Sequence, residues 1–390
     1  MYIWQAQDWP HFVYQKSIIA PKLDTIVALQ KALIGNATKL PEALDRQAEM
    51  DALIQNAIQT SEIEGEKLNV SSVRSSVARH LGLEQAGLPA GTRQTESLVK
   101  MLCAVTDNLG EPVDLALLCE WQAALFPDVP LLHDIAVGEL RGEAPMQVVS
   151  QKGNREIVHY QAPPRSELQY ELELFFEWFN SQLKQKSSTF NNGIIRAAIT
   201  HLWFITLHPF DDGNGRVARA LTDRALAQAE QTSVRFYSLS AAIEMNRTAY
   251  YEILQDTQSC CCFYQKKSDK ATDITDWINW FLEVLAEAIK QGSFRIERVM
   301  AKTRFWQTHS QTVLIARQIK VLNRLLESAG DEFLQGINAR KYQSLAKVSK
   351  ATATRDLVDL LEKGCLKKLP GSGRSTRYYI KNIKESNLLW

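Results

Sequence analysis

Residues His208-Pro209-Phe210-Asp211-Asp212-Gly213-Asn214-Gly215-Arg216-Val217-Ala218-Arg219 lie between an apolar stretch that ends at Leu207 and a helix-prone stretch. Proline and two glycines break regular structure, so this segment is predicted to be a turn that joins two helices. The glycines let the backbone approach a ligand closely, and the first N–H groups of the second helix have no partner within it. A helix start of this kind binds phosphate.

The charged residues of the turn extend this prediction. Arg216 and Arg219 are three residues apart on one helical face, so both can contact the same anion. Asp212 offers an oxygen ligand of the kind that Mg²⁺ takes together with phosphate oxygens. His208 has a reference pKa of about 6.5 and can accept a proton from a hydroxyl near neutral pH. In the structural alternative, His208 is a buried residue beside a helix start whose two arginines lie at the surface. The other specified positions of this segment would then match by coincidence.

The pattern His208-Pro209-Phe210-x-Asp212-Gly213-Asn214-Gly215-Arg216-x-x-Arg219 resembles the signature of the Fic (Fido) family at every position. Similar features extend over roughly residues 40 to 255. The resemblance implies a mainly α fold, in which a Fic-type helical bundle carries a small β-hairpin flap. It also implies a protein adenylyltransferase, or AMPylator, which uses Mg²⁺ and transfers AMP from ATP to a Ser, Thr or Tyr hydroxyl of a target protein.

The same resemblance assigns roles to the residues of the turn. His208 is the base and Asp212 holds Mg²⁺. Asn214 and the amides of the Gly213 and Gly215 loop hold the α-phosphate, and Arg216 and Arg219 hold the β- and γ-phosphates. Family members further use a helix like Ser240 to Gln255 near the adenine, which makes Asn246 and Tyr250 candidate contacts. The structural alternative for these two, a solvated asparagine and a core tyrosine, is equally supported.

A short hairpin is predicted over residues 147–160. Val148-Val149 and Ile157-Val158 are β-prone and flank a Gly-Asn centre. By resemblance this hairpin is the flap, and Val148 and Val149 align a target segment by strand addition.

Residues Thr60-Ser61-Glu62-Ile63-Glu64-Gly65 resemble the inhibitory motif of the same family. A Glu64 carboxylate paired with Arg219 would occupy the place of the γ-phosphate, and Thr60, one helical turn earlier, could fix that geometry. Because the motif precedes the turn at His208, the chain resembles the subclass with an N-terminal inhibitory helix, here about residues 43–65. A solvated glutamate at a helix end is the alternative. Some relatives use this glutamate to orient water and remove AMP, so the resemblance leaves reversal open.

The length of 390 residues favours two or three domains. The predicted divisions are an N-terminal helical region at 1–110, a catalytic core at 111–260, connecting helices at 261–305 and a separate unit at 306–390. Residues 337–390 contain twelve Lys or Arg and four acidic residues, a net charge of +8, while the preceding residues carry −7. Residues 311–380 resemble a winged helix-turn-helix, with helices to about Leu326, over 340–348 and over 352–363. DNA is therefore a candidate partner, and a dimer or protein-docking role is the alternative.

The composition of the chain limits the other functions and the cellular locations that are expected for this protein. No run of about 18 apolar residues is present and the first residues lack a signal-peptide pattern, so a cytoplasmic protein without a membrane partner is expected. The cysteines are expected to be reduced, because Cys260, Cys261 and Cys262 point in different directions on a helix. Two rival functions remain: a Fic enzyme that moves UMP, phosphate or phosphocholine, and a nucleotide-sensing, DNA-binding transcription regulator.

Overall fold

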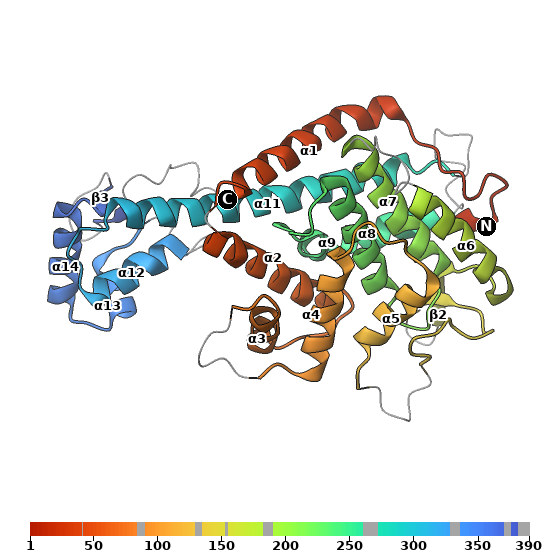
Figure 1. Ribbon diagram of the computed structural model, residues 1–390, viewed down its shortest axis with the longest axis horizontal. Helices are drawn as coiled ribbons and strands as arrows, with labels where there is room; N and C mark the ends of the chain where they lie inside the picture. The colour runs from red at the N-terminus through yellow and green to blue at the C-terminus, as the bar shows by residue number, and fades with distance from the viewer. Residues whose placement is uncertain are drawn as a thin grey trace. The chain divides into compact units, whose positions relative to one another are not determined.

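The computed structural model describes residues 1–40, 42–83, 90–128, 135–152, 155–181, 190–259, 272–327, 336–369 and 376–380. The chain divides into two compact units, Met1–Gly292 and Ser293–Trp390. Helices form most of the regular structure in both, which confirms the prediction of a mainly α protein (Figure 1).

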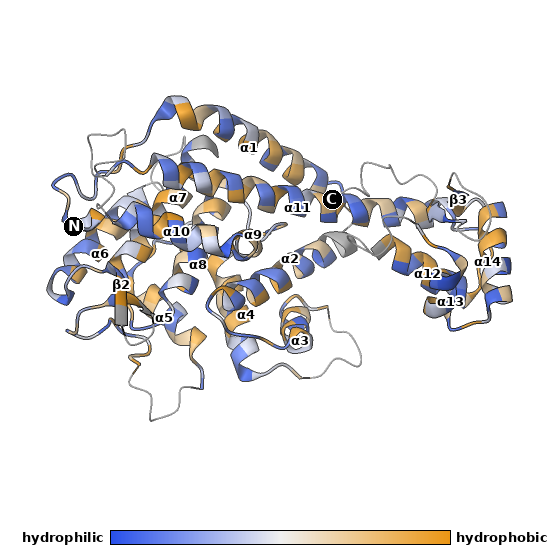
Figure 2. Ribbon diagram, turned by 180° about the vertical axis from the view of Figure 1, so that it is seen from behind, coloured by the Kyte–Doolittle hydropathy of each residue, from blue (hydrophilic) through white to orange (hydrophobic). Residues whose placement is uncertain are grey.

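The first unit is a helical assembly with one hairpin. Its helices are, in chain order, the short 3-10 helix η1 (Ile3–Gln5), α1 (Lys16–Ala37), α2 (Glu42–Ile63), α3 (Val70–His80), α4 (Arg93–Thr106), α5 (Leu115–Leu125), α6 (Arg165–Ser181), α7 (Phe190–Leu207), α8 (Asn214–Glu230), α9 (Leu239–Met245), α10 (Arg247–Gln258) and the first part of α11 (Thr275–Thr308). Figure 2 shows hydrophobic and hydrophilic residues alternating along α1 and α11, as expected for helices that bury one face.

Helices α7 and α8 pack against each other at the centre of the first unit. The predicted buried helix from Ile194 to Leu207 is the larger part of α7, and its apolar side chains are buried, as are those of α8. The two helices come very close at Gly193, where an added Cβ would lie 2.2 Å from the Cβ of Ala229. Trp277 of α11 donates a hydrogen bond to the Ala198 carbonyl. The turn between α7 and α8 is therefore fixed at both ends by packed helices.

Helix α2 contacts α3, α4, α8 and α9. It ends just before Gly65, which has a φ of +84°. Such a left-handed residue terminates a helix, and glycine adopts it without strain. Helix α4 ends beside Arg224 of α8, a buried residue whose guanidinium donates to the carbonyls of Val105, Asp107, Asn108 and Glu111. This arginine thereby satisfies the unpaired carbonyls at the end of α4.

The predicted hairpin is present as β1 (Gln147–Lys152) and β2 (Arg155–Gln161), which pair antiparallel. Its predicted Gly-Asn centre, residues 153–154, lies outside the described residues. The register shifts by one residue between Val148, opposite Tyr160, and Val149, opposite Val158. This bulge bends the hairpin locally.

One predicted helix is wrong. The segment from Ser240 to Gln255 is not one helix, because the backbone leaves helical geometry at Asn246, whose side chain donates to the Ala242 carbonyl and caps α9. Helix α11 runs without a break through Gly292 to Thr308. A Cβ at Gly292 would lie 2.6 Å from the Phe236 carbonyl, so this glycine permits close packing and does not end the helix. The cysteines at 260–262 lie outside the described residues.

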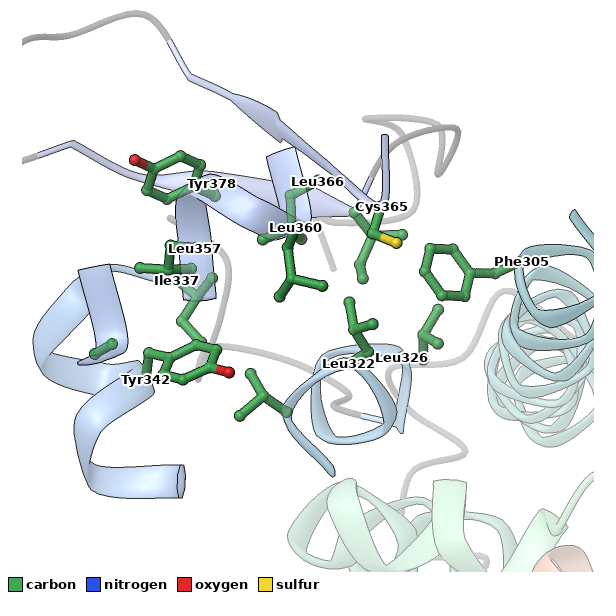
Figure 3. Close-up of a cluster of buried hydrophobic side chains, with 13 residues drawn as sticks. Phe305, Leu322, Leu326, Ile337, Tyr342, Leu357, Leu360, Cys365, Leu366 and Tyr378 are labelled. Atoms are coloured by element: carbon green, nitrogen blue, oxygen red, sulfur yellow. The ribbon is translucent and has the colours of Figure 1, made fainter. Parts of the chain in front are cut away.

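The second unit has its own hydrophobic core. Beside the end of α11 it contains α12 (Ala316–Glu327), α13 (Ala339–Ala346), α14 (Lys350–Glu362) and the antiparallel strands β3 (Leu366–Lys368) and β4 (Tyr378–Ile380). Figure 3 shows Leu322 and Leu326 of α12, Leu357 and Leu360 of α14 and Tyr378 of β4 in one cluster. Residues 370–375, between the two strands, lie outside the described residues, and the winged helix-turn-helix assignment stays a prediction.

Among the described residues, none of the helices combines the length and the apolar character that crossing a bilayer requires.

The α7–α8 contact generates a prediction about stability. Gly193→Ala should lower the stability of the first unit by about 1 to 3 kcal/mol, because the new methyl group overlaps Ala229. Gly35→Ala in α1 is the matched control: an added Cβ there meets nothing within 4 Å, so it should raise stability by about 0.5 to 1 kcal/mol. Urea unfolding followed by far-ultraviolet circular dichroism measures both. Shifts of the midpoint in the same direction would contradict the close α7–α8 contact.

Candidate active site

The turn between α7 and α8 has two residues in the left-handed region of backbone space. Gly213 has a φ of +88° and precedes α8 as its N-cap. A Cβ on it would lie 3.0 Å from Leu125 Cδ1 and 3.2 Å from the Phe126 ring, so both conformation and space require glycine. His208 has a φ of +48°, an uncommon conformation for a residue with a side chain. The surrounding structure must hold it there.

Two amides shape the far end of the turn. The Asn214 side chain accepts from the Phe210 backbone N–H and donates to the Phe210 carbonyl, at 2.9 and 2.7 Å. Gln122 of α5 donates to the Asp212 carbonyl and accepts from the Gly138 N–H. Asn214, predicted as a phosphate contact, thus has both polar atoms of its amide engaged within the turn.

His208 is held with one ring nitrogen available. Its Nδ1 lies 3.1 Å from the Ile205 carbonyl, which only a protonated Nδ1 can satisfy, so Nε2 carries the lone pair in the neutral ring. Burial lowers the pKa of His208 below its ordinary 6.5, and Arg141 lowers it further, against the opposing effects of Glu64 and Asp212. The imidazole is therefore neutral at pH 7 and able to accept a proton.

The predicted pairing of Glu64 with Arg219 is present in the structure. Arg219, 2% exposed, donates through Nη2 to Glu64 Oε1 at 2.7 Å and to the Thr60 carbonyl at 2.9 Å. Its Nε donates to the Thr60 hydroxyl at 2.9 Å. The Glu64 carboxylate also lies over the start of α8, since a Cβ on Gly215 would come within 2.2 Å of Oε1. The end of α2 thus covers the N-terminus of α8.

A second carboxylate, which is not among the residues predicted from the sequence, contacts the other arginine. Glu66 Oε1 accepts from Nη1 of Arg216 at 2.8 Å, and Arg216 is 3% exposed. Arg216 also lies 5.0 Å from the centre of the Phe126 ring. The sequence feature that could have indicated this pair is Glu66 itself, two residues after Glu64. The sequence does not show which arginine Glu66 contacts.

The ion pairs Glu64–Arg219 and Glu66–Arg216 leave N–H groups of both arginines available to bind a further anion. Burial raises the pKa of Glu64, but Arg219, and more weakly Arg216 and His208, lower it by more, so that the pKa lies below its ordinary value. Within the described part of the chain, Nη1 of Arg219 and Nε of Arg216 are buried N–H groups without a hydrogen-bond partner. Unpaired donors of this kind are costly. They fit a ligand with more anionic oxygens than one carboxylate.

Asp212 fits the single-carboxylate ligation expected of Mg²⁺ beside phosphates. Its side chain is half exposed; Oδ1 accepts from the Gly213 N–H and lies 3.7 Å from Nη2 of Arg216. In the described ranges no cluster of three or more His, Cys, Asp and Glu could bind a metal by itself. A metal at Asp212 would therefore depend on oxygens supplied by the nucleotide.

The two residues predicted near the adenine lie in different surroundings. Asn246 is exposed and joins α9 to α10, whereas Tyr250 is buried and its hydroxyl lies 2.9 Å from Nε2 of His201. His201 in turn contacts the Thr222 hydroxyl, and burial together with Arg219 lowers its pKa to about 3. Burial raises the pKa of Tyr250. This neutral network behind Arg219 was not foreseen, and the adenine contacts stay predictions.

The hairpin presents apolar side chains to solvent. Val148, Val149, Ile157 and Val158 are each about two-fifths exposed. His159 of β2 contacts Gln255 of α10, and Tyr160 is buried with its hydroxyl bonded to the Thr206 carbonyl near the end of α7. The hairpin is thus anchored on the helix that leads to His208.

Parts of the chain are similar to known proteins. Residues 2–83 match a domain of unknown function, DUF4172, and residues 112–226 match the Fic/DOC family. A protein of Nematostella vectensis named Protein adenylyltransferase Fic is 25% identical over 211 residues, which are 54% of this chain and 44% of that protein. Its namesake in Aedes aegypti is 22% identical over 212 residues, which are 54% of this chain and 38% of that protein. The chain therefore spans less than half the length of these curated relatives.

A solved structure shows the fold. A Fic domain containing signaling protein from Bacteroides thetaiotaomicron matches with a TM-score of 0.51 and 17% identity, over 71% of this chain and 97% of that one. The match shows the Fic-type helical fold. The segment that matches the Fic/DOC family, residues 112–226, contains His208, Arg216 and Arg219.

Proposed function

We propose that this protein is an adenylyltransferase that transfers AMP from ATP to a hydroxyl of a protein target, and that Glu64 holds the transfer in check. The family and its curated relatives support a nucleotidyl transferase. The observation that carries the finer proposal is the set of groups at the start of α8: two buried arginines with unpaired donors and a neutral histidine with one free ring nitrogen. Transfer from a triphosphate needs both.

The chemistry follows from these positions. A hydroxyl of the target attacks the α-phosphorus, Nε2 of His208 accepts its proton, and pyrophosphate leaves. Arg216 and Arg219, together with the N–H groups at the start of α8, stabilise the charge on the phosphates. Mg²⁺ bound by Asp212 would supply further neutralisation of that charge. The exposed valines of the hairpin would align the target segment beside this site by strand addition.

The check on transfer rests on competition for the same donors. Glu64 and Glu66 occupy Arg219 and Arg216, and Thr60 fixes Arg219 from the side of α2. A triphosphate tail needs these guanidinium groups, so ATP binds productively only when the segment after α2 withdraws.

One alternative is a Fic enzyme with the same fold that uses another donor in place of ATP. The intact arginine pair favours a triphosphate over CDP-choline, and parallel reactions with labelled ATP, UTP and CDP-choline distinguish them. The rival function from another class is a nucleotide-sensing regulator. Sensing a nucleotide needs no general base, whereas Nε2 of His208 can act as one. DNA binding by the second unit, a homodimer and removal of AMP stay predictions from the sequence.

Release of Arg219 should switch the protein on. Glu64→Gly is expected to raise incorporation of label from ATP by about 10-fold to 100-fold, since a hydrogen bond to a charged group is worth roughly 1.5 to 3 kcal/mol. Adding His208→Ala should abolish the signal. Glu62→Gly is the control, because Glu62 lies only two residues before Glu64 but bonds Gln59. An unchanged signal with Glu64→Gly would rule out the check by Glu64.

Release of Arg216 should have a smaller effect in the same direction. Glu66→Gln is expected to raise incorporation about 2-fold to 5-fold, because this pair is partly exposed to solvent. The control is Glu96→Gln, which removes a similarly exposed carboxylate from Arg79, away from the site. Equal rates for the two variants would show that Glu66 has no part in regulation.

The rate of transfer should depend on the protonation of His208. Burial lowers the pKa of His208 below 6.5, and Glu64 opposes that shift. In the Glu64→Gly variant the pKa is expected to be lower still, so the rate falls only at acid pH, where the ring is protonated, and is level near pH 7. Single-turnover rates between about pH 5 and pH 8 measure this. A half-maximal rate above pH 7 would contradict a neutral His208.

A further inference from the structure

Arg141 connects four parts of the first unit at the place where the turn begins. Its Nε donates to the His208 carbonyl at 2.8 Å, and its backbone N–H donates to the Pro209 carbonyl at 3.0 Å. Its Nη2 donates to the Pro163 carbonyl, and its own carbonyl accepts from Nε of Arg165 at the start of α6. The side chain is 2% exposed. One residue thus binds the carbonyls of both residues that open the turn.

These contacts bear on the strained conformation of His208. A left-handed φ of +48° is uncommon for a histidine and persists only where neighbours hold it. The His208 carbonyl follows the last turn of α7, where unpaired carbonyls and the negative end of the helix dipole attract a cation. Arg141 donates a hydrogen bond to this carbonyl and places a positive charge at this end of the helix.

We propose that Arg141 is the positioning residue of His208: it holds the His208–Pro209 backbone in the conformation that points Nε2 toward the reacting hydroxyl. The inference rests on the proposed function of His208 as base. It assigns Arg141 no contact with ATP or target.

The positive charge of Arg141, like its hydrogen bonds, favours His208 as a base, because it disfavours the protonated imidazole. Arg141 lowers the pKa of His208, while Glu64 and Asp212 raise it. Loss of Arg141 would therefore favour the protonated imidazole as well as free the turn.

Arg224 provides a matched control within the same unit. It is also a 2% exposed arginine, and it also binds carbonyls at the end of a helix, that of α4. Its substitution should cost stability of the same kind, but its carbonyl partners lie at 105–111, away from the turn. The two arginines separate a structural role from a positioning role.

The test compares Arg141→Met, Arg141→Lys and Arg224→Met in the active Glu64→Gly protein, at a temperature where all are folded by circular dichroism. Arg141→Met should lower kcat about 100-fold, the cost of misplacing a reacting group by about 1 Å, with little change in the KM for ATP. Arg141→Lys should recover part of kcat, because it restores the charge without the paired donors. Arg224→Met should lower the melting temperature and leave kcat within about 2-fold.

A second measurement does not depend on transfer. In protein with ¹³C-labelled histidine, the His208 ring signal is identified by its loss in His208→Ala, and its pKa is measured by NMR titration. Arg141→Met should raise that pKa and Arg224→Met should leave it unchanged. If the Glu64→Gly parent transfers no AMP, the proposed function has failed, and this titration alone decides the role of Arg141. Equal effects of the two methionine variants on kcat and on the His208 pKa would overturn the inference.

Discussion

Two buried arginines at the start of α8 set the main constraint on this protein. Arg216 and Arg219 are almost fully enclosed, at the end of the helix where the dipole is already positive. Buried charges are costly unless they are paired. The end of α2 and the residues that follow it meet this demand with a threonine and two carboxylates, which explains why residues 150 or more positions away in the sequence are held at the site.

The same demand bears on the regulation that we propose. A planar carboxylate and a tetrahedral phosphate both present anionic oxygens that an arginine can bind with paired donors. The donors left unpaired show that the carboxylates do not use the full capacity of the two arginines. Glu64 and Glu66 thus pair the buried arginines and leave N–H groups for the triphosphate that the proposed function requires.

The base side of the site depends on a different set of contacts. The turn is fixed from behind by Gln122, Asn214 and Arg141, which bond its carbonyls, and by Ile205, which fixes the tautomer of His208. The groups proposed for phosphate binding and for proton transfer are therefore held by different elements: α2 with α8 for the arginines, and α7 with the 136–142 loop for His208.

Sequence by itself determined the features that depend on neighbouring residues. The glycines and proline of residues 208–219 predicted the turn, and the apolar run that ends at Leu207 predicted a buried helix. Two β-prone pairs on either side of a Gly-Asn centre predicted the hairpin. The spacing of Thr60 and Glu64, four residues apart, predicted that both could meet Arg219, and both do. Local geometry fixes each of these patterns, so a linear reading suffices.

Only the tertiary structure decided the contacts between distant segments. It brought Glu66 to Arg216 and Arg141 to His208, broke the predicted helix at Asn246, carried α11 through Gly292, and buried Tyr250 against His201. A charged or amide side chain has many partners available in a sequence of this length. Which one it meets is set by the close packing of α2, α7 and α8, because burial removes water as an alternative partner and leaves only the groups that the fold brings within reach.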